Sequence, residues 1–354
     1  MTERPVELLG LTRSKLAVAL QPIIDRPFRV GQIYDAIHLK GVRSIAAITT
    51  LRKDLREQLN QGFVVGLPEV AALHTSSDGT RKFLFSLHDG ATIEAVDIPD
   101  RGRHTLCVSS QAGCALACRF CVTGFWGAGR NLSAGEIVAQ VYAIRFGTPP
   151  LEPSLNLVFM GMGEPLLNLE NLREALEILS EEISLRRITV STAGVVPGIE
   201  AMAGWERRPN LAVSLHAPDD ERRDRIMPIN KSYPIASLLQ ALERFPLEKG
   251  RRITFEYILI RDFNDSLADA DALARLLKRI PSKINLIPAN PDPVLGEMMV
   301  PPRESSIRAF QQRLMDRGYT ATVRRRRGDD VSAACGQLRA PSRDPRGFRG
   351  TLSL

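Results

Sequence analysis

Four of the five cysteines lie within the short stretch CVSSQAGCALACRFC, residues 107–121. Cys114, Cys118 and Cys121 have the spacing C-x3-C-x2-C, Cys107 precedes them, and Cys335 lies far downstream. Three thiolates on one compact loop can hold three irons of a cubane cluster and leave the fourth iron without a protein ligand. That open iron can bind the amino and carboxylate groups of S-adenosylmethionine (SAM) and pass an electron to its sulfonium. The trio therefore predicts one 4Fe–4S cluster per chain, with SAM as its partner.

A structural zinc site is the alternative interpretation of the trio. Such sites normally use two C-x2-C or C-x2-H pairs, and here a fourth ligand would have to come from elsewhere in the chain, with His104 and Cys107 as candidates. The asymmetric spacing favours the cluster. The zinc alternative describes a colourless RNA-binding protein without enzymatic activity, whereas the cluster predicts a brown, oxygen-sensitive enzyme. A dithiol oxidoreductase built on Cys107 and Cys335 is a further alternative, but it would leave the trio without a use.

Polar and small residues follow several apolar runs downstream. The run ending in FMGMGEPLLN has Gly161 and Gly163, which let the backbone approach a ligand, and Glu164, whose carboxylate can pair with the ammonium of a bound methionine. Other runs end in polar residues in the same way, namely Ser191, Ser214, His216 and Asn290. Taken singly, each could be an ordinary cap or turn residue. Ser133 with Glu136 is interpreted as a helix capping box.

Short apolar runs alternate with amphipathic stretches after Thr105. The runs after the cysteine stretch are LNLVFM, RITVST, LAVSLH, ITFEYILI and KINLIP, and helical patterns such as NLREALEIL separate them. This alternation predicts right-handed crossovers and a parallel sheet of the α/β class. We expect a partial (β/α)6 barrel, with an open doubly wound sheet as the alternative. In both folds the ligand site lies at the carboxyl ends of the strands.

The remaining segments complete the expected domain organisation. Residues 1–63 have helical periodicity and predict a small N-terminal accessory domain. Residues 64–99 alternate with period two around Asp89-Gly90 and predict an antiparallel β-hairpin connector. The barrel core is expected over residues 100–330, and residues 331–354 form a C-terminal segment with Cys335 and a basic tail, SRDPRGFRG.

Composition limits the class of protein. The chain has 354 residues, 44% hydrophobic and 25% charged, which is typical of a globular protein. An odd number of cysteines, no export signal at the N-terminus and no apolar run of bilayer length predict a cytoplasmic protein without a membrane partner. A formal net charge of +7 and the run Arg324 to Arg327 favour a polyanionic partner such as RNA, although both features also suit an ordinary solvated surface.

Taken together, these motifs resemble the radical SAM methyl synthases of the RlmN/Cfr family, which methylate adenosine in RNA. The resemblance is closer to the RlmN branch and covers nearly the whole chain, through LCVSSQAGCALACRFC, RNLSAGEI, GMGEPLLN, SLHAPDDERRD, PINKSYP, TFEYILI, NLIPANP and RGDDVSAACGQL. It implies a 4Fe–4S cluster on the trio and a SAM site formed by Gly163, Glu164, Ser191, Ser214, Leu215, His216 and Asn290. The loop CVTGFWGAGRNL and the four arginines before GDD depart from the usual pattern.

The resemblance also implies roles for three catalytic residues. Adenine ring carbons are too electron-poor to attack a sulfonium methyl, so the family uses a radical route and consumes two SAM molecules. Cys335 would carry the methyl group, Glu94 would accept the ring proton, and Cys107 would release the product through a transient disulfide. Without the resemblance, Cys107 and Cys335 would be interpreted as inert buried thiols and Glu94 as an exposed strand carboxylate.

The position of methylation is not fixed by the sequence. We favour carbon 2 of an adenosine in 23S rRNA, with tRNA as a further candidate substrate, and carbon 8 of 23S rRNA adenosine is the alternative. The radical route also requires a low-potential electron donor such as flavodoxin or ferredoxin.

Overall fold

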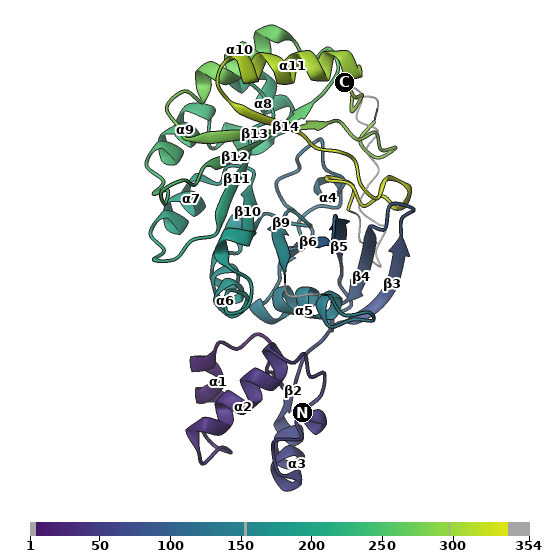
Figure 1. Cartoon of the computed structure of the whole chain (residues 1–354), viewed down its shortest axis with the longest axis vertical. Coiled ribbons are helices and arrows are strands. Elements are labelled where there is room, and N and C mark those ends of the chain that lie inside the picture. The colour runs from purple at the N-terminus through teal and green to yellow at the C-terminus, as the bar shows by residue number, and fades with distance from the viewer. Residues whose placement is uncertain (1–4, 152–153, 297, 339–354) are drawn as a thin grey trace.

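The computed structural model describes residues 5–151, 154–296 and 298–338 (Figure 1). Its largest feature is a ten-stranded sheet with the order β14-β13-β12-β11-β10-β9-β6-β5-β4-β3. Within the described residues, the strands from β6 to β14 in this order pair in parallel. They are β6 (Arg103–Cys107), β9 (Leu155–Phe159), β10 (Ile188–Thr192), β11 (Asn210–Ser214), β12 (Ile253–Leu259), β13 (Ser282–Pro288) and β14 (Thr320–Val323).

Helices connect successive parallel strands, and Figure 1 shows α6, α7, α9, α10 and α11 along the outer side of the curved sheet. They are α5 (Ala134–Arg145), α6 (Leu169–Leu179), α7 (Val196–Ala203), α8 (Asp220–Ile226), α9 (Ile235–Glu243), α10 (Leu267–Leu276) and α11 (Glu304–Asp316). The expected partial (β/α)6 barrel is thus confirmed, and β14 adds a strand that the sequence did not predict. Its four residues, TATV, are too short and too polar to give a clear strand pattern.

The antiparallel β-element joins directly to this barrel sheet. It consists of β3 (Glu69–Thr75), β4 (Arg81–Ser86) and β5 (Thr92–Asp100), and β5 pairs antiparallel with β6. The predicted turn at Asp89-Gly90 is confirmed, because it connects β4 to β5 and Gly90 has a φ of 84°. The inner face of the barrel therefore continues without interruption onto the antiparallel strands.

The N-terminal region packs under α5. It contains α1 (Arg13–Leu20), α2 (Pro27–His38) and α3 (Lys53–Gly62), with a small parallel pair of β1 (Val6–Glu7) and β2 (Phe63–Val64) that the helical periodicity did not predict. The side chains of His38 and Tyr142 lie within hydrogen-bonding distance, 3.0 Å, across this contact. Covered by this region on one side and by the sheet on the other, α5 is buried along nearly its whole length. Its predicted capping box of Ser133 and Glu136 is confirmed.

Short elements complete the described chain. A pair of two-residue strands, β7 (Gln111–Ala112) and β8 (Arg130–Asn131), flanks the cysteine loop, and α4 (Val122–Phe125) follows its last cysteine. Single 3-10 turns occur at Ile45–Ala47, Pro165–Leu167, Leu185–Arg187, Pro228–Lys231 and Asp329–Val331. No helix among the described residues is long and apolar enough to cross a membrane. The predicted basic tail SRDPRGFRG lies outside the described residues.

Candidate functional site

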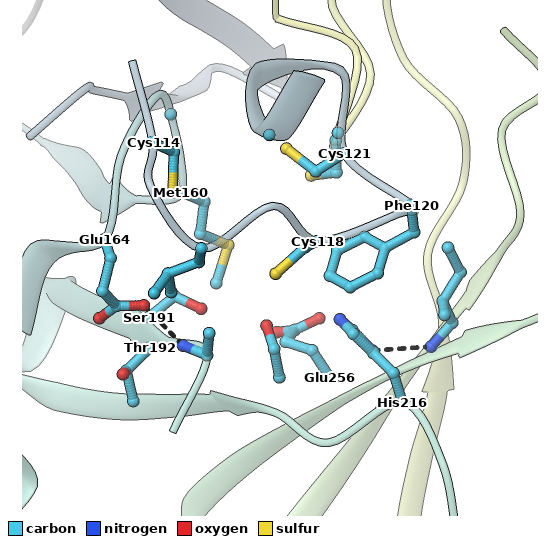
Figure 2. Close-up of a pocket in the computed structure, with 18 of the residues that line it drawn as sticks. Cys114, Cys118, Phe120, Cys121, Met160, Glu164, Ser191, Thr192, His216 and Glu256 are labelled. Carbon is cyan, nitrogen blue, oxygen red and sulfur yellow. Dashed lines mark hydrogen bonds between the residues drawn. The ribbon is translucent and has the colours of Figure 1, made fainter. Parts of the chain in front are cut away.

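A pocket opens at the carboxyl ends of the parallel strands, where both sheet folds considered above would place a ligand. Figure 2 shows the cysteine loop on one side of this pocket, facing Glu164, Ser191, Thr192, Glu256 and His216 on the other. Ten of the candidate ligand-site residues line it together: Cys114, Cys118, Cys121, Gly161, Gly163, Glu164, Ser191, Ser214, His216 and Cys335. The structure thus gathers into one cavity residues that are spread over more than half of the chain.

Backbone contacts shape the cysteine loop. The N–H of Cys114 donates to the carbonyl of Gly127 at 2.9 Å, and the N–H of Cys121 donates to the carbonyl of Cys118 at 3.1 Å. All three thiols are free. Burial raises the pKa of the Cys118 thiol well above its usual value, and the neighbouring Cys121 and Cys114 raise it further. Thiolates gathered in this way need a cation to offset their charge, and the irons of a cubane cluster supply it, so the donor set fits a 4Fe–4S cluster.

Glu164 follows strand β9 and is buried against two backbone donors. Its Oε2 accepts a hydrogen bond from the N–H of Ala193 at 2.7 Å, and its Oε1 accepts one from the N–H of Leu166 at 3.0 Å. Burial nevertheless raises the pKa of Glu164 to about 7. Gly163 beside it has a φ of +94°, and a Cβ there would lie 2.5 Å from the side chain of Gln111. The carboxylate thus lies in the pocket without a cationic partner in the described chain, which fits a role in holding the amino group of SAM.

Strand β10 contributes Ser191. The end of β11 and the two residues after it contribute Ser214, Leu215 and His216. The Nδ1 of His216 accepts a hydrogen bond from the N–H of Ile258 at 3.1 Å, and burial lowers the pKa of the imidazole to about 3, so His216 is neutral. The His216 ring packs edge-on against Phe120 of the cysteine loop, with ring centroids 4.4 Å apart. Leu215 is fully buried below the pocket and is not part of its lining. The carbonyls of Ser214 and Leu215 both accept from the buried guanidinium of Arg223.

Asn290 lies in an adjoining hollow that it shares with Cys335 and Arg324. Its Nδ2 donates to the carbonyl of Cys335 at 3.2 Å. Its buried Oδ1 has no hydrogen-bond partner among the described residues. A buried acceptor without a donor is costly, so a ligand group with an N–H or O–H fits at this position.

Cys107 lies at the end of β6, behind the pocket and close to Cys335. Burial raises the pKa of the Cys107 thiol, and the nearby Cys335 raises it further, whereas Arg324 lowers it. The guanidinium of Arg324 lies in the pocket lining beside Cys335 and Met160. The two cysteines outside the trio, far apart in sequence, therefore share one environment.

Glu94 lies on the inner face of β5 and does not reach the pocket lining. It is 4% exposed, so the interpretation of an exposed strand carboxylate is wrong. Its Oε1 lies 3.2 Å from the Nζ of Lys82, which is also buried. Strand pairing aligns Cys107 with Val96, two residues from Glu94, so the three side chains share one face of the sheet.

Sequence reasoning missed several residues of the pocket, among them Met160, Glu256 and Arg324. Glu256 lies in β12 next to Ser214, is buried, and accepts a hydrogen bond from Asn285 at 2.7 Å. A glutamate within the apolar run ITFEYILI was a usable signal, because a charge in a buried strand needs a reason. Arg324 gave no comparable signal, since it begins a run of four arginines.

Comparison with known proteins agrees with this geometry. Residues 108–277 match the family model described as the radical SAM superfamily, and residues 6–65 match the ribosomal RNA large subunit methyltransferase N-terminal domain. A protein of Anaeromyxobacter dehalogenans named dual-specificity RNA methyltransferase RlmN is 45% identical over 345 residues, covering 94% of this chain and 92% of its own. The protein of the same name from Geobacter sulfurreducens is 47% identical, with the same coverage.

A solved structure provides an independent comparison of the fold. The crystal structure of a radical SAM methyltransferase from Sphaerobacter thermophilus is 43% identical and superimposes with a TM-score of 0.89, covering 95% of this chain and 99% of that chain. Because this identity extends over nearly the whole length of the chain, the barrel, the cysteine loop and the N-terminal region all match proteins of one family. The chain therefore belongs to the RlmN family of the radical SAM superfamily and is a SAM-dependent methyltransferase.

Proposed function

We propose that this enzyme methylates carbon 2 of adenosine in RNA, with 23S rRNA as its substrate and tRNA as a second one. The position of Cys335 is the main observation in support of this proposal. Cys335 lines the same pocket as the cluster trio and is near enough to Cys107 to raise the pKa of the Cys107 thiol. A methyltransferase that used SAM only as a polar methyl donor would need neither a cluster nor a second thiol in this place. The relatives named dual-specificity RNA methyltransferase RlmN support RNA as the substrate.

The cofactors are held by residues of the pocket and, in the case of Asn290, of the adjoining hollow. Cys114, Cys118 and Cys121 hold the cluster, while Glu164 accepts hydrogen bonds from the amino group of SAM. Ser191, Ser214, His216 and Asn290 contribute the remaining polar contacts to SAM. When bound, the cluster would supply one-electron chemistry: it would reduce SAM by one electron, so that the 5′-deoxyadenosyl group could take hydrogen from an S-methyl group, and it would accept the one electron released after carbon–carbon bond formation. A flavodoxin or ferredoxin supplies the first electron.

Three residues of the chain then carry the methyl group through the reaction. The Cys335 thiolate attacks the methyl carbon of a first SAM, forming an S–CH3 bond and releasing S-adenosylhomocysteine. After the second SAM has been used, the methylene carbon on Cys335 is bonded to carbon 2 of adenine, and Glu94 takes the proton that this carbon loses. The Cys107 thiolate attacks the sulfur of Cys335, so that an S–S bond forms and the S–CH2 bond breaks. The methylene carbon takes a proton and becomes the methyl group, and a dithiol reductant restores both cysteines.

The two cysteines outside the trio give the sharpest test of this sequence. Cys107→Ala keeps the carrier and loses the attacking thiol, so protein covalently joined to RNA should accumulate. Cys335→Ala removes the carrier, so neither adduct nor methylated adenosine should form, although SAM still binds. A denaturing gel with labelled RNA distinguishes the two. Free methylated product from Cys335→Ala, or no adduct from cluster-loaded Cys107→Ala, would show that the roles are misassigned.

The position of methylation is tested separately. Nucleosides from the RNA of a strain lacking the gene should lose 2-methyladenosine by mass spectrometry, in 23S rRNA and in tRNA. Loss of 8-methyladenosine instead would assign the carbon-8 reaction.

A further inference from the structure

Lys82 is a buried lysine whose ammonium group lies against the carboxylate of Glu94 on the neighbouring strand. It lies on β4, 7% exposed, with its Nζ 3.2 Å from the Oε1 of Glu94. Strand pairing aligns Leu84 with Glu94 and Lys82 with Val96, so Lys82 is the diagonal neighbour of Glu94 on the same face. A buried ion pair of this kind contributes little net stability compared with apolar side chains of similar size. A lysine at this position therefore calls for an explanation other than folding.

The ammonium group also reaches the segment that carries Cys335. Its Nζ donates to the carbonyl of Ser332, three residues before Cys335, at 3.4 Å. The same β-element holds the start of this segment, because the Oδ2 of Asp78 accepts from the N–H of Gly328 at 3.1 Å and the N–H of Ser77 donates to the Oδ2 of Asp330 at 3.0 Å. The antiparallel element thus carries Glu94 on β5 and holds the segment of Cys335 through its β3–β4 turn, and Lys82 on β4 contacts both.

We infer that Lys82 is a positioning residue for the methylation reaction: it holds the carboxylate of Glu94 ionised and aligns it with the base attached to Cys335. A carboxylate surrounded by protein tends to take up a proton, and an adjacent ammonium opposes this. Only the ionised carboxylate can accept the ring proton. The inference rests on the proposed role of Glu94 as proton acceptor.

The step affected is the transfer of one proton. The C–H bond at carbon 2 of the adduct breaks, its electron pair returns to the ring, and the proton moves to an oxygen of Glu94. Lys82 exchanges no atom with the substrate. Loss of Lys82 should therefore slow proton removal and leave methylation of Cys335 and cleavage of SAM intact.

The experiment uses full-length, cluster-loaded enzyme with an rRNA fragment as substrate. Two quantities are measured: the amount of 5′-deoxyadenosine formed per methylated adenosine, and the kinetic isotope effect with adenosine deuterated at carbon 2. Lys82→Gln should raise the first ratio about tenfold, within the range of general base catalysis, and should produce a larger isotope effect. Lys82→Arg keeps the positive charge, so its ratio of 5′-deoxyadenosine to methylated adenosine should lie closer to the wild-type value than that of Lys82→Gln.

Arg81 provides a matched control on the same strand. Its guanidinium pairs with the buried Asp97 at 2.8 Å on the opposite face of the sheet. Arg81→Gln thus removes a similar ion pair away from Glu94, and both quantities should stay at wild-type values. An unchanged isotope effect in Lys82→Gln, or an equal change in Arg81→Gln, would overturn the inference.

A double variant separates failure of this inference from failure of the proposed function. If Lys82 acts through Glu94, then Lys82→Gln/Glu94→Gln should behave like Glu94→Gln alone, and it has no uncompensated buried charge that would impair folding. A further loss in the double variant would refute the positioning role. If Glu94→Gln itself leaves both the ratio of 5′-deoxyadenosine to methylated adenosine and the isotope effect unchanged, the proton acceptor has been misassigned. If wild-type enzyme does not methylate RNA, the proposed function fails as a whole.

Discussion

Glu164 should make SAM binding depend on pH near neutrality. Its side chain is buried at the wall of the pocket, and burial raises its pKa from 4.5 to about 7. Only the ionised carboxylate is a full acceptor for the amino group of SAM. A proton must therefore leave Glu164 when SAM binds below pH 7, and affinity should fall as the pH is lowered through this range.

The magnitude follows from the pKa. With a pKa of about 7, the carboxyl is about one-tenth ionised at pH 6 and about nine-tenths ionised at pH 8. Affinity for SAM should thus be about tenfold weaker at pH 6 than at pH 8. The same shift affects the free protein. Because the folded-state pKa is raised, the stability contribution of the group is fully present below pH 4.5 and is lost as the pH rises through about 7, by about 3 kcal/mol in total.

The assay is an anaerobic SAM titration of cluster-loaded enzyme at pH 6 and pH 8, performed on wild type and Glu164→Gln. Comparison of the two proteins cancels the titration of SAM itself and of other groups. Glu164→Gln should bind SAM more weakly at pH 8 and should lack the tenfold difference. Its amide also places a donor against the N–H of Ala193 or Leu166, so unfolding is measured as a check on folding. The same pH dependence in both proteins would refute the reasoning.

Three further predictions concern the cluster, the RNA and the release step. Cys118→Ala should lose cluster assembly and SAM cleavage together, because a missing thiolate leaves a second iron unsupported, and wild-type iron content with normal cleavage would contradict the assignment. RNA affinity, measured by filter binding, should fall about tenfold for every two phosphate contacts between about 50 and 200 mM salt, and a flat response would exclude phosphate contacts as a main source of affinity. Because burial raises the pKa of Cys107, its thiolate is scarce at neutral pH, so single-turnover release of methylated RNA should accelerate from pH 7 to pH 9; a constant rate would argue against Cys107 as the attacking group.

The sequence predicted those parts of the site that depend on local spacing. The trio of Cys114, Cys118 and Cys121 lies on one loop, so its spacing alone predicts that the thiols gather. Glu164 and Ser191 follow apolar runs, and parallel strands bring their carboxyl ends to one edge of the sheet. Two periodicities, one for strands and one for helices, were therefore enough to predict the barrel and the position of its mouth.

The parts that the sequence did not predict depend on contacts between distant segments. Lys82 is followed by FLF and looks like a solvent-exposed strand residue, and only the closure of the sheet against residues 328–338 buries it beside Glu94. Arg324 looks like one member of a basic surface run, yet the register of β14 directs it into the pocket. The register between these strands depends on tertiary packing, so it could not be predicted from local sequence patterns in this chain.

The segment that carries Cys335 packs closely against the cysteine loop, and this contact determines where Cys335 lies. The N–H of Val122 donates to the carbonyl of Gly336 at 2.6 Å, and the Oγ1 of Thr123 donates to the carbonyl of Leu338 at 2.9 Å. Gly336 has a φ of +81°, and a Cβ there would lie 2.8 Å from the carbonyl oxygen of Phe120. The segment can approach the loop this closely only because position 336 lacks a side chain.

Gly336→Ala should therefore displace Cys335 from the SAM site and leave the cluster in place. The left-handed conformation itself costs an alanine about 1 kcal/mol, and the contact with Phe120 adds a displacement of the segment. Gly318→Ala is the matched control, since Gly318 has a φ of +88° and a Cβ there would meet no atom within 4 Å, so it carries the conformational cost alone. Cluster-loaded Gly336→Ala should retain SAM binding and form less S-methylated Cys335 and less methylated RNA, by about tenfold or more, because misplacement of reacting atoms by about 1 Å can cost a hundredfold in rate. Mass spectrometry of the Cys335 peptide and of the RNA measures both. Equal activity in Gly336→Ala and Gly318→Ala would mean that close contact with the cysteine loop does not position the carrier.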